Sequence, residues 1–154
     1  MQVQHHKKYI LRQAKGFTLL EMLIVLMIVS VLTSLTLTVF QSVVETKRTE
    51  FFLEQFERDL LYAQSYAINH NCAVYTYIQS EKHAYFIRDC NYNKLLERGY
   101  SNDIIVEVGT MQPIITYKNN GNAVKSGSFY FLIRKDRYKF VQLLGKGRFY
   151  VKKV

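Results

Sequence analysis

The chain has 154 residues, of which 49 % are hydrophobic and 21 % are charged, so a disordered polypeptide is excluded and one modest domain fits. The formal net charge is +9, from 21 Lys and Arg against 12 Asp and Glu. Residues 1–16 carry four of the basic side chains and no acidic one, whereas residues 17–40 contain a single charge, that of Glu21. This distribution argues against a free cytosolic globular protein.

The apolar segment 17–40 is long enough to cross a membrane as a helix, because it spans roughly 36 Å at about 1.5 Å per residue. Basic flanks stay cytoplasmic, so we expect residues 41–154 outside the membrane. The apolar run is longer than the core of an ordinary cleaved signal peptide. A plain membrane anchor is the alternative, but it does not explain Glu21, whose carboxylate is unfavourable in lipid unless it is paired or neutralised.

The residues around this carboxylate carry a recognisable motif. Residues 15–23 read KGFTLLEML, and this stretch resembles the class III signal of type IV pilins and pseudopilins. The resemblance implies that residues 1–16 are a leader, that prepilin peptidase cuts between Gly16 and Phe17, and that Phe17 becomes N-methylated. It gives Glu21 a role in assembly, in which its carboxylate neutralises the new amino terminus of a neighbouring subunit.

The resemblance also implies partners and a location. The partners are the other pilins of the same fibre, prepilin peptidase and the cytoplasmic membrane. The chain would first be a single-pass protein of the cell membrane with a cytoplasmic amino terminus, and would lie at the cell surface in a pilus after assembly. Residues 17–40 would be the transmembrane and fibre-core helix.

The segment from residue 41 to about residue 69 has the pattern of an amphipathic helix. Its apolar side chains recur at spacings of three and four residues, namely Leu53, Phe56, Leu60, Ala63 and Ala67. Charged side chains, Asp59 among them, occupy much of the remaining surface. Because no Gly or Pro interrupts residues 17–68, one continuous helix is expected.

Beyond residue 71 the hydrophobic period changes to two, which predicts strands. The expected strands are 73–78, 84–87, 104–108, 114–117, 129–134, 138–144 and 148–154, with a polar loop at 89–103 and turns at 119–122 and 135–137. Short connections favour antiparallel pairing, so the class is α+β. The pilin resemblance implies the same arrangement, a long amino-terminal helix packed on an antiparallel sheet, with residues 41–154 as the extracytoplasmic domain.

The two cysteines allow a disulfide, because they lie in the part expected outside the membrane. A hairpin centred on Glu81 would place Ile78 opposite Ala84 and Cys72 opposite Cys90, at a separation that suits a disulfide. The alternative is two reduced, buried cysteines that act as small hydrophobic side chains.

The search for chemistry returns no catalytic residue, metal ligand or cofactor motif, so no enzyme is expected. Residues 111–154 instead hold ten basic side chains and one acidic, with tyrosines between them. The candidates for contact with double-stranded DNA are Lys135, Arg137, Lys139 and Arg148. The alternatives are cations that protect strand edges, or contact with an acidic helix of a neighbour or an anionic cell-wall polymer.

Pro113 is the only proline, so the apolar helix lacks the helix-weakening residues that major pilins often carry. This favours a minor pilin or pseudopilin, and the resemblance extends to the minor pilins of competence systems. The function expected is a minor subunit of a competence-type DNA-uptake pilus. The alternatives are a minor pseudopilin of type II secretion and a minor subunit of another type IV pilus.

Overall fold

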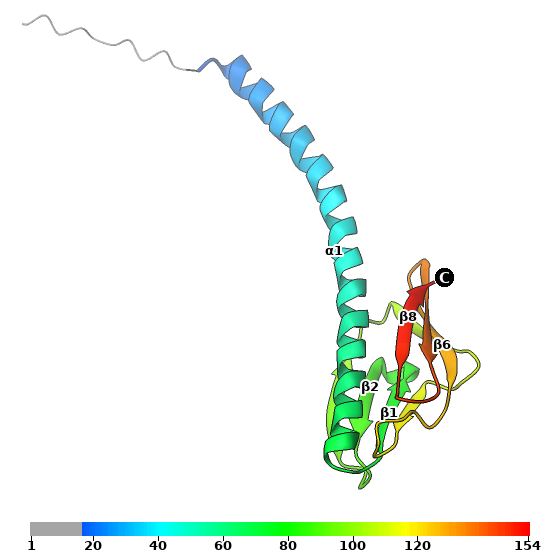
Figure 1. Cartoon of the computed structure of the whole chain (residues 1–154). Helices are drawn as coiled ribbons and strands as arrows, with labels where there is room; N and C mark the ends of the chain where they lie inside the picture. Colours follow the sequence, from blue (N-terminus) through cyan, green and yellow to red (C-terminus); the bar gives the residue numbers. More distant parts are fainter. Residues whose placement is uncertain (1–16) are drawn as a thin grey trace, which may run out of the picture. The chain divides into compact units, whose positions relative to one another are not determined.

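The computed structural model describes residues 17–154, apart from the side chains of residues 35–42. The first element is helix α1 (Leu19–Asn69), and eight strands follow it (Figure 1). Contacts divide the chain into two compact units, one that ends at Val44 and one from Glu45 to Val154. We call the second the folded unit. The expected continuous helix is present, while the leader 1–16 lies outside the described residues.

The folded unit contains two antiparallel four-stranded sheets, which confirms the α+β class. The strand order in the first sheet, sheet A, is β3-β2-β1-β5, and in the second, sheet B, it is β4-β6-β7-β8. The strands are β1 (Val74–Gln79), β2 (Ala84–Arg88), β3 (Lys94–Gly99), β4 (Ile104–Val108), β5 (Ile114–Tyr117), β6 (Gly127–Ile133), β7 (Asp136–Gln142) and β8 (Phe149–Lys153), with a short 3-10 helix at Ser80–Lys82.

One face of α1 supplies the centre of the core. Phe56, Leu60, Ala63 and Ala67 are completely buried, as their helical spacing predicts, and Phe52 is more deeply buried than the expected Leu53. The ring of Phe56 makes edge contacts with Tyr85 of sheet A and with Phe131 and Phe140 of sheet B, at centroid distances of 5.2, 5.2 and 5.8 Å. Both sheets therefore share one core against the helix.

One prediction for the helix surface is wrong, because Asp59 is buried rather than solvated. Its Oδ2 accepts hydrogen bonds from the Tyr85 hydroxyl at 2.7 Å and from Arg98 Nε at 3.0 Å. Tyr85 lies in β2 and Arg98 in β3, so one helical carboxylate ties α1 to two strands of sheet A. A buried charge is tolerated because a cation and a hydroxyl satisfy it.

Three local predictions for the sheets need correction. The segment expected as a polar loop contains β3, a charged strand that pairs with the open edge of β2. The β1–β2 hairpin is shifted by one residue, with Ile78 opposite Tyr85, because four residues connect the strands. The turn expected at 135–137 falls at 134–135, and Asp136 and Arg137 already belong to β7. Positive φ at Arg134 (59°) gives this tight turn the left-handed backbone conformation.

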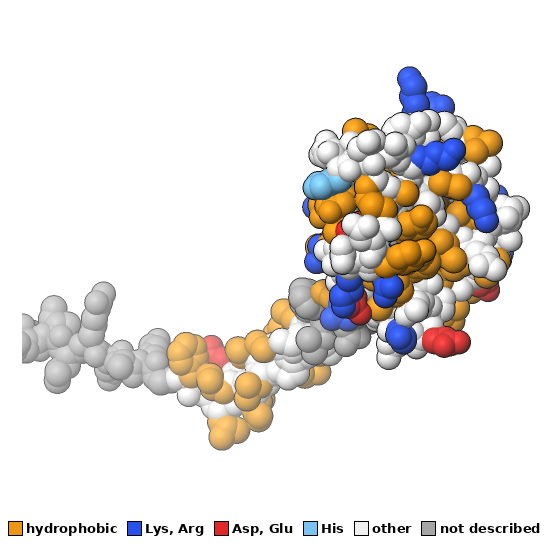
Figure 2. Space-filling model, turned by 90° about the horizontal axis from the view of Figure 1, so that it is seen from below, with side chains coloured by type: hydrophobic (Ala, Val, Ile, Leu, Met, Phe, Trp, Pro, Cys, Tyr) orange, Lys and Arg blue, Asp and Glu red, His pale blue; other side chains and the backbone are white. Residues whose placement is uncertain are grey.

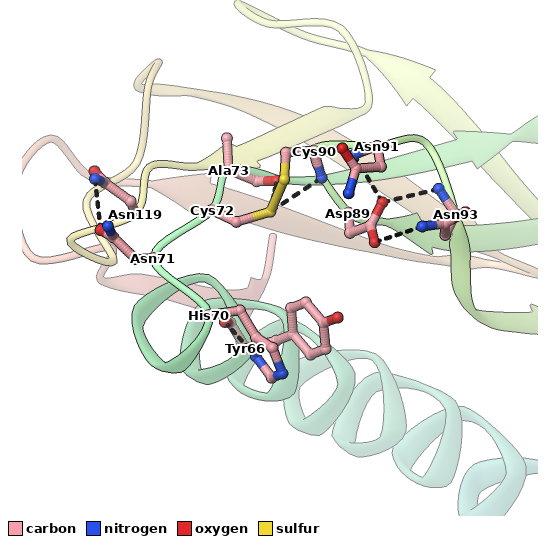
Figure 3. Close-up of a disulfide and its surroundings, with 10 residues drawn as sticks. All are labelled: Tyr66, His70, Asn71, Cys72, Ala73, Asp89, Cys90, Asn91, Asn93 and Asn119. Atoms are coloured by element: carbon pink, nitrogen blue, oxygen red, sulfur yellow. Dashed lines mark hydrogen bonds between the residues drawn. A yellow bond between two sulfur atoms is a disulfide. The ribbon is translucent and has the colours of Figure 1, made fainter.

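Cys72 and Cys90 form a disulfide with Cα atoms 5.7 Å apart, and both lie outside the strands (Figure 3). Helix α1 ends in a Schellman motif, in which Asn71 has positive φ (49°) and the Cys72 amide donates to the Ala67 carbonyl. Cys90 follows β2, and its amide donates to Cys72 Sγ at 3.2 Å. The bridge therefore does not depend on the predicted hairpin register, since it joins two loops beside the ladder.

Candidate assembly motif and nucleic-acid interface

The motif at the amino terminus forms a helix cap. Thr18 precedes α1, and its Oγ1 accepts a hydrogen bond from the Glu21 amide at 3.2 Å. Glu21 lies in the first turn, where the helix dipole favours a negative charge. Thr18 and Glu21 have the spacing of a capping box, a signal present in the sequence but not used in its interpretation. Gly16, on the amino-terminal side of the expected cut, lies outside the described residues.

Around this motif the apolar side chains have no protein contacts that bury them. Phe17 is 77 % exposed, and the large apolar side chains from Leu19 to Leu32 are also exposed. Hydroxyls in this stretch are satisfied by their own helix, since Ser30 and Thr33 donate to the carbonyls of Leu26 and Val29. Within the described part of the chain, no helix has a stretch sufficiently long and apolar to span a membrane. The segment predicted to span one, 17–40, includes side chains outside the described residues.

The four residues predicted to contact nucleic acid lie along the β7–β8 hairpin, but not in one cluster. Arg137 and Lys139 lie two residues apart on β7, so their side chains point to the same face of the sheet. Lys135 lies in the turn that precedes β7. Arg148 lies just before β8, at the opposite end of β7, where its carbonyl accepts from the Leu143 amide. The structure therefore brings Arg137 and Lys139 together and places Arg148 several residues away along the strand pair.

The neighbours of Arg137 compensate part of its charge. Its Nη2 lies 2.8 Å from Glu107 Oε2, and its guanidinium lies over the ring of Tyr130 with 3.9 Å to the centroid. Lys139 Nζ is 5.8 Å from the centroid of the same ring. Tyr130 thus presents an aromatic surface between two cations, an arrangement that suits both cation–π contacts and stacking against a base.

Strand pairing adds a cation that the sequence alone did not single out. Lys139 lies directly opposite Lys152 in the β7–β8 ladder, and no ion pair involves either residue in the described part of the chain. Like charges opposite each other are unfavourable, and a bound anion would relieve the repulsion. Only the register could show this pair, because 12 residues of sequence separate the two lysines.

Other cations of the folded unit support the alternative to DNA contact, in which basic side chains serve the structure of the chain itself. Lys153 pairs with Asp136 at 2.8 Å, and Arg134 pairs with both Glu45 and Asp103, so these cations fix local structure. On the face shown in Figure 2, Lys and Arg side chains are spread around exposed hydrophobic side chains instead of forming one block. No cluster of His, Cys, Asp and Glu that could hold a metal occurs among the described residues.

Comparisons with known proteins give one sequence match, near the amino terminus, and one structural match. Residues 11–37 match the family described as the prokaryotic N-terminal methylation motif. No curated protein matches the sequence. Among solved structures, the chain is similar to the minor pseudopilin EpsH from the type 2 secretion system of Vibrio cholerae, with 10 % identity and a TM-score of 0.54. The match covers 68 % of this chain and 95 % of EpsH.

At 10 % identity the likeness to EpsH shows the fold alone, a long helix against antiparallel sheets. The methylation motif is a second and independent similarity, found in the amino-acid sequence. A methylation motif of this kind implies anchoring in a membrane through the amino-terminal helix. The motif and the fold together support a type IV pilin-like family for this chain.

Proposed function

We propose that this chain is a minor pilin, or pseudopilin, of a competence-type DNA-uptake pilus, most like the minor pilin ComGD. The observation that carries the subunit role is the methylation motif at residues 11–37, placed ahead of a folded unit with the pseudopilin fold. The expected role is structural, with prepilin peptidase and the other pilins of the fibre as partners and no catalysis by the chain itself.

In this function the cap at the start of α1 prepares the mature end for assembly. Cleavage between Gly16 and Phe17 leaves a positive amine one residue before Thr18, the residue that caps the helix. Glu21 lies one helical turn further on, with its amide held by that cap. A subunit that enters the fibre would use the Glu21 carboxylate to neutralise the Phe17 amine of a neighbour, because two buried opposite charges are tolerable only as a pair.

The DNA-uptake part of the proposal rests on the β7–β8 hairpin. Lys139 and Lys152 are unpaired cations side by side, Arg137 flanks them, and Lys135 and Arg148 extend the positive charge toward the two ends of the hairpin. Phosphates of double-stranded DNA would bind here without sequence preference, through charge and the release of counterions. Several copies or several minor pilins in one fibre would multiply a weak single-site affinity.

The test of DNA contact uses the full chain in a non-ionic detergent with a fluorescent DNA duplex. Lys139→Gln together with Lys152→Gln should weaken binding and lower the slope of log affinity against log salt by about 2, because each lost phosphate contact removes roughly 0.9. Lys47→Gln together with Lys118→Gln removes the same charge elsewhere and should leave the slope nearly unchanged. Equal binding by the two variants would refute this DNA-binding surface but leave the subunit role intact.

A second candidate is a minor pseudopilin of a type II secretion system, and the structural likeness to EpsH favours it. Deletion of the gene that encodes this chain, in the cells that produce it, distinguishes the two candidate functions. Loss of DNA uptake with normal protein export supports the competence role, whereas export failure with normal uptake supports the secretion role. A third arm, surface motility, detects a minor subunit of another type IV pilus.

A further inference from the structure

The outer face of sheet A is aromatic where a solvent-facing sheet would ordinarily be polar. Its inner face packs on α1 through buried Val74, Ile87 and Ile115. The outer face carries two cross-strand rows, set by the strand register: Thr116–Tyr75–Arg88–Lys94 and Ile114–Tyr77–Phe86–Glu97. Antiparallel sheets with one face in water normally alternate apolar and polar residues, and strand β1 departs from that rule with tyrosines at two of its three outward positions.

The aromatic rings of this face form a continuous series. Ring centroids are 5.9 Å apart for Tyr92 and Tyr75, 6.3 Å for Tyr75 and Tyr77, and 5.4 Å for Tyr77 and Phe86. The ring planes are nearly parallel, with interplanar angles of 3°, 23° and 28° in the same order. We call these four residues the aromatic row. Aromatic side chains of this kind are platforms on which bases of a single strand can stack, whatever the base.

Tyr92 is held in the row by a loop with strong local constraints. It is 62 % exposed, and its backbone has positive φ (62°), which is uncommon for a residue other than glycine. Buried Asp89 fixes this loop by accepting from the amides of Asn91 and Asn93 at 2.9 and 2.8 Å, as Figure 3 shows. The Cys72–Cys90 disulfide anchors the same loop to the end of α1. An exposed ring is thus kept in a strained backbone position against Tyr75.

Two cations, Arg88 and Lys94, and one acidic residue, Glu97, lie in the outward rows beside the aromatic rings. The Arg88 guanidinium lies over the Phe86 ring with 5.0 Å to the centroid, and its buried Nε has no hydrogen-bond partner among the described residues. Glu97, the acidic member of the two rows, is paired with Lys94. Arg88 therefore places a positive charge directly beside the rings of the aromatic row. A neutral glycan would use the rings but would leave Arg88 without an anionic partner.

We propose that the aromatic row and Arg88 bind single-stranded nucleic acid, with bases stacked on the rings and a phosphate bound by Arg88. The chemistry is that of other single-strand sites, which combine sequence-tolerant stacking with positive charge. This site is on sheet A, whereas the proposed contact with duplex DNA is on sheet B. A paired duplex hides its base faces, so it cannot use the aromatic row.

The experiment measures binding of a fluorescent 12-nucleotide oligo(dT) to the full chain in a non-ionic detergent. Tyr75→Thr and Tyr77→Thr are the test variants, because threonine favours strands and both side chains lie away from the core. Each should weaken binding about tenfold, within the range known for loss of one base stack. Tyr150→Thr is the matched control, an exposed tyrosine on β8 of the other sheet, and should bind oligo(dT) like the unmodified chain.

A second measurement localises the contact and does not depend on how stable a variant is. Ultraviolet crosslinking of oligo(dT) to the unmodified chain should label peptides that contain Tyr75, Tyr77 or Tyr92. Labelling confined to β7 and β8, unchanged affinity in both test variants, or binding to purified cell-wall glycan without binding to oligo(dT) would overturn the proposal. Lys139→Gln with Lys152→Gln should lower duplex binding and leave oligo(dT) binding unchanged, so failure of one proposal is distinguishable from failure of the other.

Discussion

Replacement of Asp59 by alanine tests how α1 is fastened to sheet A. The carboxylate accepts from the Tyr85 hydroxyl at 2.7 Å and from Arg98 Nε at 3.0 Å. Tyr85 is 1 % exposed, so its hydroxyl has no access to water once the carboxylate is gone. Arg98 differs, because its side chain is 44 % exposed and can turn to solvent.

The expected loss of stability follows from these two exposures. A buried hydroxyl left without an acceptor costs about 1–3 kcal/mol. Loss of the ion pair with the exposed Arg98 adds about 0.5–1 kcal/mol after screening by water. The higher helix propensity of alanine returns roughly 0.5 kcal/mol. We therefore expect Asp59→Ala to lower the free energy of unfolding by about 1–3.5 kcal/mol, a large share of the stability of a small domain.

The measurement is urea unfolding of the mature chain in detergent, followed by near-ultraviolet circular dichroism of the tyrosines. Glu54→Ala is the matched control, because its carboxylate pairs with Arg58 on the exposed surface of the same helix, and its loss should stay near 0.5 kcal/mol. In the Asp59→Ala background, Tyr85→Phe should cost nothing further, since it removes the unpaired hydroxyl. A loss below 0.5 kcal/mol for Asp59→Ala, or additive losses in the double variant, would refute the explanation.

Three more expectations follow. Cys72→Ala with Cys90→Ala should lower the free energy of unfolding by about 3 kcal/mol, because the bridge closes a loop of 18 residues in the unfolded chain. Reduction of the unmodified chain should reproduce that loss. Burial raises the pKa of Tyr117, so the folded state keeps its hydroxyl protonated, and stability that is complete below about pH 10 should fall as pH rises beyond that value. Tyr117→Phe should remove this part of the loss of stability at alkaline pH. At pH 7 it should not destabilise the fold, because the Tyr117 hydroxyl has no hydrogen-bond partner among the described residues. A decrease of more than about 1 kcal/mol in the free energy of unfolding at pH 7 would contradict this. Glu21→Val should give a cleaved, membrane-held chain that enters fibres poorly, and normal incorporation, measured by mass spectrometry of purified fibres, would exclude the pairing with the amine of Phe17.

Sequence periodicity was sufficient for the helix and for most strands. Phe56, Leu60, Ala63 and Ala67 are buried because a helix places residues three and four apart on one face, whatever covers that face. The same local rule located seven strands within a few residues, since alternation of apolar side chains is a property of the strand itself. The methylation motif is likewise a local signal, and its capping geometry at Thr18 needs only the first turn of α1.

The features that the sequence did not show depend on contacts between distant residues. β3 has little alternation of its own and exists because β2 offers an open edge. Asp59 has the spacing of a surface residue, and only the arrival of Tyr85 and Arg98 from sheet A makes its burial favourable. The Lys139–Lys152 pair and the aromatic row arise from strand register, which one extra residue in a connection shifts by one position. Local energies therefore determined which elements form, whereas the proposed binding surfaces were decided by how the strands pair, because pairing sets which side chains become neighbours.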